Sequence, residues 1–111
     1  MSAVTTHVLD AALGRPAVAV AVQLQRPDGD GWAQIAAGAT NADGRIPELG
    51  PDELEPGTYR LRFDTAAYFT ATDRAGFYPE VTIVFSITPD GRHYHVPLLL
   101  SPYAYSTYRG S

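Results

Sequence analysis

The feature that most limits how this chain can fold is a repeated pattern in which apolar residues occupy every second position of short segments. Clusters of Gly, Pro, Asp and Asn separate these segments and indicate turns. The segments predicted as strands are residues 5–12, 18–24, 32–39, 59–63, 81–87, 93–100 and 103–108. Seven to eight short strands at this regular spacing are typical of a sandwich or a barrel, so we expect an all-β fold.

Residues 65–73 form the one segment whose pattern favours a helix, with Asp64 or Thr65 available as its N-cap. A helix this short is not stable alone and must pack against the strands. The 111 residues can bury one core but are too few for a second. We therefore expect residues 1–111 to form a single domain.

The composition argues against several classes of function. The formal net charge of −4 disfavours nucleic acid as a partner, because phosphate binding requires a basic surface. The chain contains no Cys, which excludes disulfides, thiolate catalysis and Cys-type zinc sites. No apolar run approaches the roughly 20 residues of a membrane span, and the N-terminus has no signal-peptide pattern. We expect no nucleic-acid or membrane partner, and a cytoplasmic location.

The C-terminal residues 92–111 carry an unusual strand pattern. One face of the predicted strand is an ordinary core face, formed by Tyr94, Val96, Leu98 and Leu100. The opposite face changes from imidazoles to apolar groups, with His93, His95, Pro97 and Leu99. A face that only meets water rarely has this composition. An aromatic terminus that contains Arg and has no polar tail also suggests a chain end that is docked and used.

The histidines His7, His93 and His95 are the strongest candidates for chemistry. A single His on a strand is most often a surface residue or one held by a hydrogen bond, and this applies to each of them. His7 and His95, however, lie on strand faces whose other members are largely apolar or small. The unperturbed pKa of His, about 6.5, suits a general base near neutral pH. His93 lies nearer the turn, and we expect it to be more exposed and to support the others.

A zinc site is the competing use of these histidines. The spacing of His93 and His95 puts both rings on one strand face, and His7 would be a distant third ligand. Asp10 is the one nearby carboxylate that could complete or orient such a site. Because this pattern is weak, we predict no metal and no other cofactor.

Arg45 follows the turn residue Gly44, and Arg109 lies two residues from the C-terminus. Either can be interpreted as a solvent-facing charge. No Ser lies in a nucleophile-elbow pattern, and there is no Gly-rich phosphate loop. The simplest enzymatic chemistry left is activation of water by imidazole, with Arg cations that bind and polarise an electron-rich substrate.

Three motifs extend this interpretation. The first is His7 within Thr-His-Val-Leu-Asp, followed by Gly-Arg-Pro-Ala, and the second is Arg45 within Asp-Gly-Arg-Ile. The third covers residues 93–111 and ends in Tyr-Arg-Gly-Ser, the most specific part. Together they resemble the 5-hydroxyisourate hydrolase family, also called transthyretin-related proteins, over essentially the whole chain. The resemblance implies a two-sheet transthyretin-like β-sandwich with one short helix. It also implies a homotetramer, a dimer of dimers, with active sites in a channel between subunits.

The reaction implied by the resemblance is hydrolysis of 5-hydroxyisourate to 2-oxo-4-hydroxy-4-carboxy-5-ureidoimidazoline, a step of urate degradation. His7 and His95 would orient and deprotonate the attacking water, and Arg45 would stabilise negative charge on the substrate. Substrate binding would involve His7, Arg45 and the terminal residues Tyr108, Arg109, Gly110 and Ser111. We also expect the charge of Arg45 to keep the nearby imidazoles neutral.

Two alternatives come from other classes of function. The first is a transthyretin-like carrier that holds a small aromatic ligand without turning it over. The resemblance disfavours it, because the vertebrate hormone carrier lacks the terminal tetrapeptide and the groups equivalent to His7, Arg45 and His95. The second alternative, an adhesive sandwich domain, is weakened by the missing signal peptide.

Overall fold

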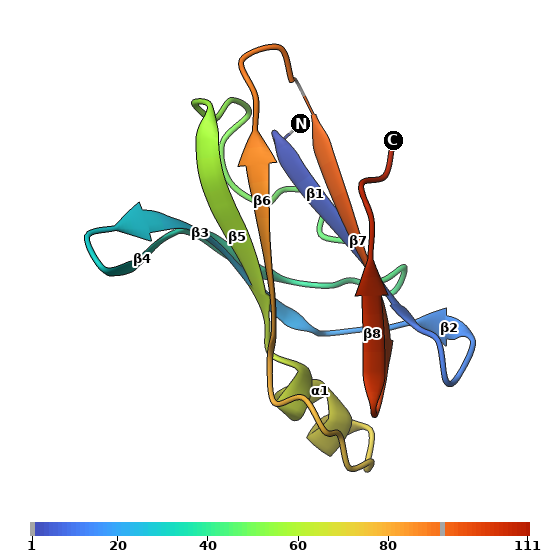
Figure 1. Ribbon diagram of the computed structural model, residues 1–111. Helices are drawn as coiled ribbons and strands as arrows, with labels where there is room; N and C mark the ends of the chain where they lie inside the picture. Colours follow the sequence, from blue (N-terminus) through green and yellow to red (C-terminus); the bar gives the residue numbers. More distant parts are fainter. Residues whose placement is uncertain (1, 92) are drawn as a thin grey trace.

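Two four-stranded sheets packed face to face make up this computed structural model, which describes residues 2–91 and 93–111 (Figure 1). The first sheet has the order β2-β1-β7-β8, with bounds Arg15–Pro16, Val4–Asp10, Tyr94–Ser101 and Ala104–Thr107. The second has the order β4-β3-β5-β6, with bounds Gly31–Ala39, Ala21–Asp28, Gly57–Phe63 and Val81–Ile87. This architecture confirms the predicted two-sheet β-sandwich.

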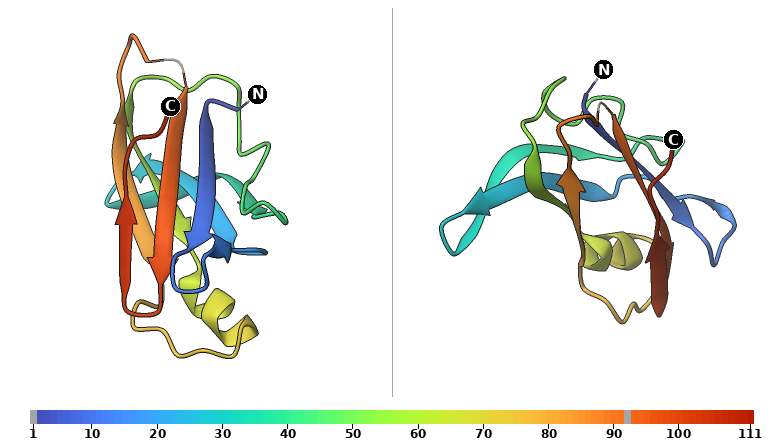
Figure 2. Two further views of the ribbon diagram at one scale, coloured as in Figure 1. Left: turned by 90° about the vertical axis from the view of Figure 1, so that its right-hand side faces the viewer. Right: turned by 45° about the horizontal axis from the view of Figure 1, so that its top comes forward.

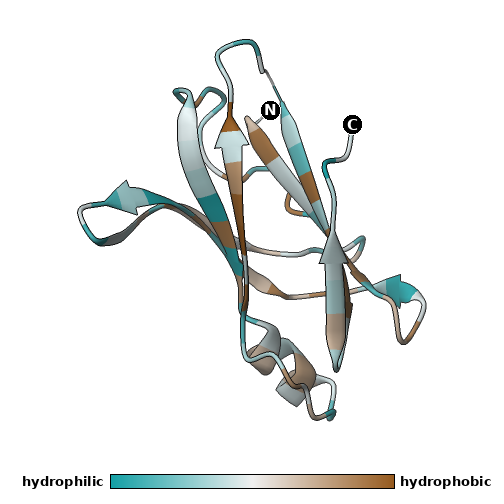
Figure 3. Cartoon of the chain, in the orientation of Figure 1, coloured by the Kyte–Doolittle hydropathy of each residue, from teal (hydrophilic) through white to brown (hydrophobic). Residues whose placement is uncertain are grey.

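The core lies between the sheets and is built from the alternating apolar positions. Fully buried side chains from both sheets meet there, including Val4, Val8, Val22, Leu24, Leu61, Phe63, Leu98 and Leu100. Each such side chain stabilises the fold by about 1.5–3 kcal/mol relative to an exposed position. Figure 3 shows the same alternation as brown and pale bands along the strands. The outward positions of the first sheet are therefore free to carry other chemistry.

The predicted helix is confirmed as α1, Thr65–Ala71. Asp64 caps it, because its side chain accepts a hydrogen bond from the backbone N–H of Ala67 at 3.1 Å. The helix ends earlier than predicted, since Asp73 has a left-handed backbone with φ of 57°. It lies at the end of the sandwich opposite both termini (Figure 1 and Figure 2). No helix of the described residues is long and apolar enough to cross a membrane.

Strands β1 and β7 pair in parallel, although they come from opposite ends of the chain (Figure 2). The register places Thr5 opposite His95 and His7 opposite Pro97. Because side chains alternate across a strand, these four residues share the outer face of the sheet. The pairing therefore brings the first and last predicted motifs together.

The predicted strand at residues 18–24 is wrong at its start. Strand β3 begins at Ala21, and Val18 remains 50% exposed. The cause is a kink at Ala19, whose φ of 63° breaks the extended backbone, while its N–H donates to the carbonyl of Thr40 at 2.9 Å. Strand β3 also continues to Asp28, so the hairpin loop is shorter than the predicted Pro-Asp-Gly-Asp-Gly loop.

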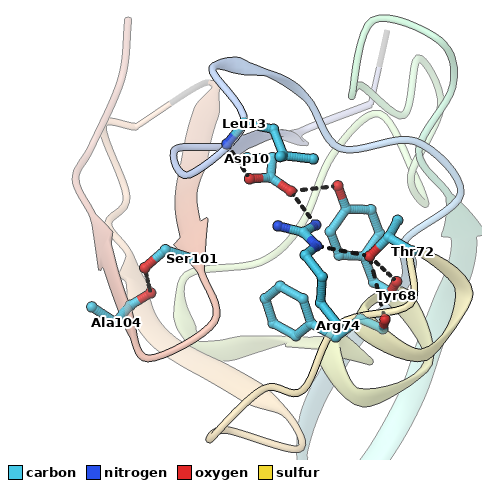
Figure 4. A network of polar contacts seen from close by, with 8 residues as sticks. Asp10, Leu13, Tyr68, Thr72, Arg74, Ser101 and Ala104 are labelled. Carbon is cyan, nitrogen blue, oxygen red and sulfur yellow. Dashed lines mark hydrogen bonds and ion pairs between the residues drawn. The ribbon is translucent and has the colours of Figure 1, made fainter.

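A buried polar network ties the end of β1 to the helix (Figure 4). The carboxylate of Asp10 accepts hydrogen bonds from the hydroxyl of Tyr68 at 2.7 Å, the backbone N–H of Leu13 at 2.9 Å, and the guanidinium of Arg74. Burial alone would raise the pKa of Asp10, but the hydrogen bonds from Arg74 and Tyr68 outweigh it and lower that pKa. The guanidinium also packs over the ring of Phe69 at 5.1 Å. The network holds the end of β1 against α1 and the segment that follows it, although Nη1 of Arg74 is buried without a hydrogen-bond partner among the described residues.

Candidate active site

Four segments meet on the outer face of the first sheet: β1, β7, the turn at residues 41–45, and the C-terminal residues. Two isolated β-bridges, His7 with Arg45 and His95 with Gly110, fix the turn and the C-terminal segment against the sheet. Both bridges hold a backbone segment against the outer face of the first sheet, near His7 and His95. The three predicted motifs therefore converge within one subunit.

The turn positions Arg45 through its own hydrogen bonds. The side chain of Asn41 accepts from the backbone N–H groups of Asp43 at 2.9 Å and Arg45 at 3.1 Å. The carbonyl of Gly44 accepts from the N–H of Val8 at 2.7 Å. Gly44 has φ of 75°, and a Cβ there would lie 2.4 Å from the carbonyl oxygen of Val8. Glycine is required at this position both for the backbone conformation and for the close approach to β1.

His7 is half-buried, and its ring orientation is set by this turn. Its Nε2 lies 2.9 Å from the carbonyl oxygen of Asp43. A carbonyl oxygen only accepts, so the ring must donate from Nε2. In neutral His7 the lone pair is therefore on Nδ1, which is the atom free to accept a proton.

His95 and His93 share one hydroxyl. The Oγ1 of Thr5 lies 2.9 Å from Nδ1 of His95 and 3.1 Å from Nε2 of His93. Burial lowers the pKa of His95, and its electrostatic interactions with Arg45, His7 and His93 lower it further. A lowered pKa keeps this imidazole neutral and able to accept a proton at neutral pH.

The C-terminal segment runs directly over His95. The N–H of Gly110 donates to the carbonyl of His95 at 2.8 Å. A Cβ at Gly110 would lie 2.5 Å from Cδ2 of the imidazole, so no larger residue fits without a shift. The chain end is thereby held beside the ring.

A cleft of about 240 Å³ opens where these groups meet. It is lined by Thr5, Thr6, Arg45, Pro47, His93, His95 and Ser111. Of the predicted site residues, Arg45, His95 and Ser111 line it, and Gly110 contacts His95. His7 is bridged to Arg45 but does not line the cleft itself. Among the described residues, no group of three or more His, Cys, Asp or Glu is placed to hold a metal ion.

Tyr108 and Arg109 lie elsewhere in the single chain. They line a separate cleft of about 340 Å³ at the open edge of the sandwich, where side chains of β6 and β7 also lie. The guanidinium of Arg109 stacks over the ring of Tyr94 at 4.5 Å. The structure thus does not bring these two residues together with His95, and their role in substrate binding stays a prediction.

Thr5 and Pro47 were not singled out from the sequence. Thr5 lies two positions before His7, so the period-2 pattern already placed both on one face. No signal in the sequence shows that Thr5 lies opposite His95, because that depends on the parallel register. The expectation that His93 is more exposed than His95 is not confirmed, since both side chains are half-buried.

Comparisons with known proteins show which family and which solved structures the chain resembles. Residues 4–110 match the model of the HIUase/Transthyretin family. The chain is 47% identical to 5-hydroxyisourate hydrolase of Mus musculus over 99% of this chain and 96% of that protein. It superposes on the Klebsiella pneumoniae 5-hydroxyisourate hydrolase with a TM-score of 0.86 and 38% identity, over 100% of this chain and 94% of that one. Transthyretin from Sparus aurata gives a TM-score of 0.91, also with 38% identity, over 99% and 97%.

Proposed function

This chain belongs to the HIUase/transthyretin family, and we propose that it hydrolyses 5-hydroxyisourate in urate degradation. The observation that carries the proposal is the cleft in which Arg45, His95 and Ser111 meet, with His7 bridged to Arg45. Those are the groups that a water-activating hydrolase needs: a neutral base, a cation and a rim that positions substrate. The 47% identity to a 5-hydroxyisourate hydrolase supports the same substrate.

In the proposed reaction a water molecule attacks a ring carbonyl of the substrate and the ring C–N bond breaks. His95 is the proposed base, since burial and the charge of Arg45 lower its pKa and keep it neutral. His7, with its lone pair on Nδ1, is the second imidazole that orients or deprotonates the water. Arg45 stabilises the negative charge that develops on the attacked carbonyl oxygen. The proton taken from the water is returned to the leaving ring nitrogen.

The proposed assembly is a homotetramer built as a dimer of dimers. Strands β6 and β8 are the outer strands of their sheets at the same open edge, and their unpaired backbone groups can pair with a second copy. On β6, Val84 is 58% exposed, which fits a surface that a second chain covers. Sedimentation should find four chains per particle. A monomer at micromolar concentration would contradict this part of the proposal.

The direct test of function is ultraviolet monitoring of freshly prepared 5-hydroxyisourate with and without the protein. We expect the absorbance of 5-hydroxyisourate to decay well above the spontaneous rate when the protein is present. A metal chelator should leave this rate unchanged. Decay at the spontaneous rate would contradict the proposal.

A transthyretin-like carrier is the second candidate, because the fold matches transthyretin with a TM-score of 0.91. It predicts saturable binding of a small aromatic ligand without turnover of 5-hydroxyisourate. The same assay, combined with equilibrium binding, separates the two functions.

A further inference from the structure

We propose that Thr5 and His93 are positioning residues for the general base: they hold His95 with a proton on Nδ1 and form a path along which that proton can move. The proposal rests on the proposed function, in which His95 accepts a proton from water. Thr5 lies on β1 and the two histidines on β7, so the parallel pairing of the strands assembles the group.

The hydroxyl of Thr5 restricts how the two rings can be protonated. A hydroxyl has one hydrogen to donate, yet its oxygen lies 2.9 Å from His95 Nδ1 and 3.1 Å from His93 Nε2. It therefore cannot donate to both nitrogens. At least one of the two ring nitrogens must carry a hydrogen and donate to Oγ1.

Only one arrangement leaves His95 ready to act as a base in the cleft. Its Nε2 lies across the ring from Thr5, next to Cδ2, where Gly110 and the chain end pack. For Nε2 to hold the lone pair, Nδ1 must carry the hydrogen and donate it to Thr5. The hydroxyl of Thr5 then donates to Nε2 of neutral His93. In this arrangement a third group orients the base, as in other His-dependent sites.

The surrounding charges give His93 a second role. His95 faces Arg45 from the turn, His7 from β1, His93 from its own strand and Ser111 from the chain end. Burial and the first three groups disfavour a positive charge on His95. When Nε2 takes the proton of water, the Nδ1 proton can pass to Thr5 while the hydroxyl proton passes to His93 Nε2. The reverse transfer lets His95 Nε2–H protonate the leaving nitrogen and restores neutral His93.

The test compares Thr5→Val, Thr5→Ser and His93→Gln with the parent protein. Thr5→Val keeps the β-branched shape and removes the hydroxyl, whereas Thr5→Ser keeps the hydroxyl. His93→Gln keeps hydrogen-bonding capacity but cannot take up a proton. Thr58→Val on β5, an exposed Thr far from the cleft, is the matched control for the Thr-to-Val change.

We expect Thr5→Val and His93→Gln to lower kcat by about 10-fold or more, a part of the 10²–10⁴-fold that a general base contributes. KM should change less than kcat, Thr5→Ser should restore most of the loss, and Thr58→Val should match the parent. Nitrogen-15 NMR should show the Nδ1–H tautomer of His95 in the parent and in Thr5→Ser, and a loss of that preference in Thr5→Val.

Two results would overturn the proposal: a parent His95 protonated on Nε2, or Thr5→Val and His93→Gln with unchanged kcat. If Thr5→Val fails to fold, His93→Gln and the parent tautomer still decide the question. Two further results separate this proposal from the proposed function. If the parent protein does not accelerate the decay of 5-hydroxyisourate, the proposed function is wrong. If His95→Ala keeps full activity, His95 is not the base and the positioning role falls with it, whereas an inactive His95→Ala beside a fully active Thr5→Val refutes the positioning role alone.

Discussion

Strand β1 contributes to two polar clusters that differ in how their charges are balanced. On its inner face Asp10 is buried and accepts hydrogen bonds from three donors, one of them the cation Arg74. On its outer face His7 is paired with Arg45, and both residues are among the groups that lower the pKa of His95. The first cluster pairs opposite charges, whereas in the second a cation and neighbouring imidazoles disfavour a positive charge on His95.

The pKa directions express this difference. Arg74 and Tyr68 lower the pKa of Asp10, which means that the charged form is stabilised in the fold. Burial and Arg45 lower the pKa of His95, which means that its charged form is destabilised. Stabilising the charged form of Asp10 adds to the stability of the fold, whereas a lowered pKa leaves His95 neutral and able to accept a proton. We therefore expect mutations in the outer cluster to change turnover and mutations in the inner cluster to change stability.

The largest expected effect is on turnover in the outer cluster. His95→Ala should lower kcat by about 10²–10⁴-fold, because a general base is lost. Arg45→Ala should lower it by about 10²-fold or more, because charge on the attacked carbonyl oxygen loses its partner. Urea unfolding should show stability within about 1 kcal/mol of the parent, since these side chains are not core residues.

Arg26→Ala, which removes an exposed Arg on β3, is the control for Arg45→Ala and should leave turnover unchanged. His7→Ala is the third variant of this set. Unchanged turnover in any of the three site variants would remove that residue from the mechanism.

The next largest effect is on stability in the inner cluster. Asp10→Asn should lower the free energy of unfolding by about 3 kcal/mol, because Arg74 loses its partner in a buried pair. Tyr68→Phe removes one hydrogen bond to the carboxylate and should cost about 1.5 kcal/mol. Both folded variants should keep the parent kcat. If Asp10→Asn or Tyr68→Phe lowered kcat without lowering stability, the inner cluster would serve catalysis and the two clusters would not have separate roles.

The pH dependence sharpens this prediction. A lowered folded-state pKa stabilises the fold above the unfolded-state value, about 3.9 for Asp, and this contribution is lost as the pH falls below it. The difference in unfolding free energy between the parent and Asp10→Asn should therefore be largest near pH 7 and shrink below about pH 4. A constant difference would mean that Asp10 is not the titrating group.

A smaller effect is expected where the backbone of the turn meets β1. Gly44→Ala should cost about 1–3 kcal/mol and lower kcat, because it strains the backbone at positive φ and pushes against the carbonyl of Val8. Gly29→Ala is the matched control, since Gly29 also has positive φ, 61°, but open space around its Cβ position. Gly29→Ala should destabilise less and leave kcat unchanged. Equal effects of the two would mean that backbone strain alone, without the contact to Val8, matters.

The smallest expected effect is the change in the pKa of His95 that the charge of Arg45 causes. Because the pKa of His95 is lowered from its ordinary value of 6.5, kcat/KM should begin to decline at a lower pH than it would with an unperturbed histidine as the base. In Arg45→Gln the pKa of His95, followed by NMR titration, should move upward, while burial still holds it below the ordinary value. An unshifted His95 would show that burial alone sets its protonation.

The sequence by itself determined the faces of the strands and several local features. Alternation assigned Val96 and Leu98 to the core and His95 to the opposite face, because side-chain direction depends only on position within a strand. The N-cap at Asp64 was equally visible, since a cap needs only the first turn of its helix. The motifs around His7, Arg45 and the C-terminus also identified the family and supplied the candidate site residues.

The tertiary structure decided which faces meet and in which register. The parallel pairing of β1 with β7 puts Thr5 between His93 and His95, and packing at the open edge turns Arg109 onto Tyr94 and away from the cleft. The kink at Ala19, which shortens the predicted strand, likewise depends on a hydrogen bond to Thr40. These contacts join segments far apart in the chain, so they follow from packing of the whole core and not from local periodicity.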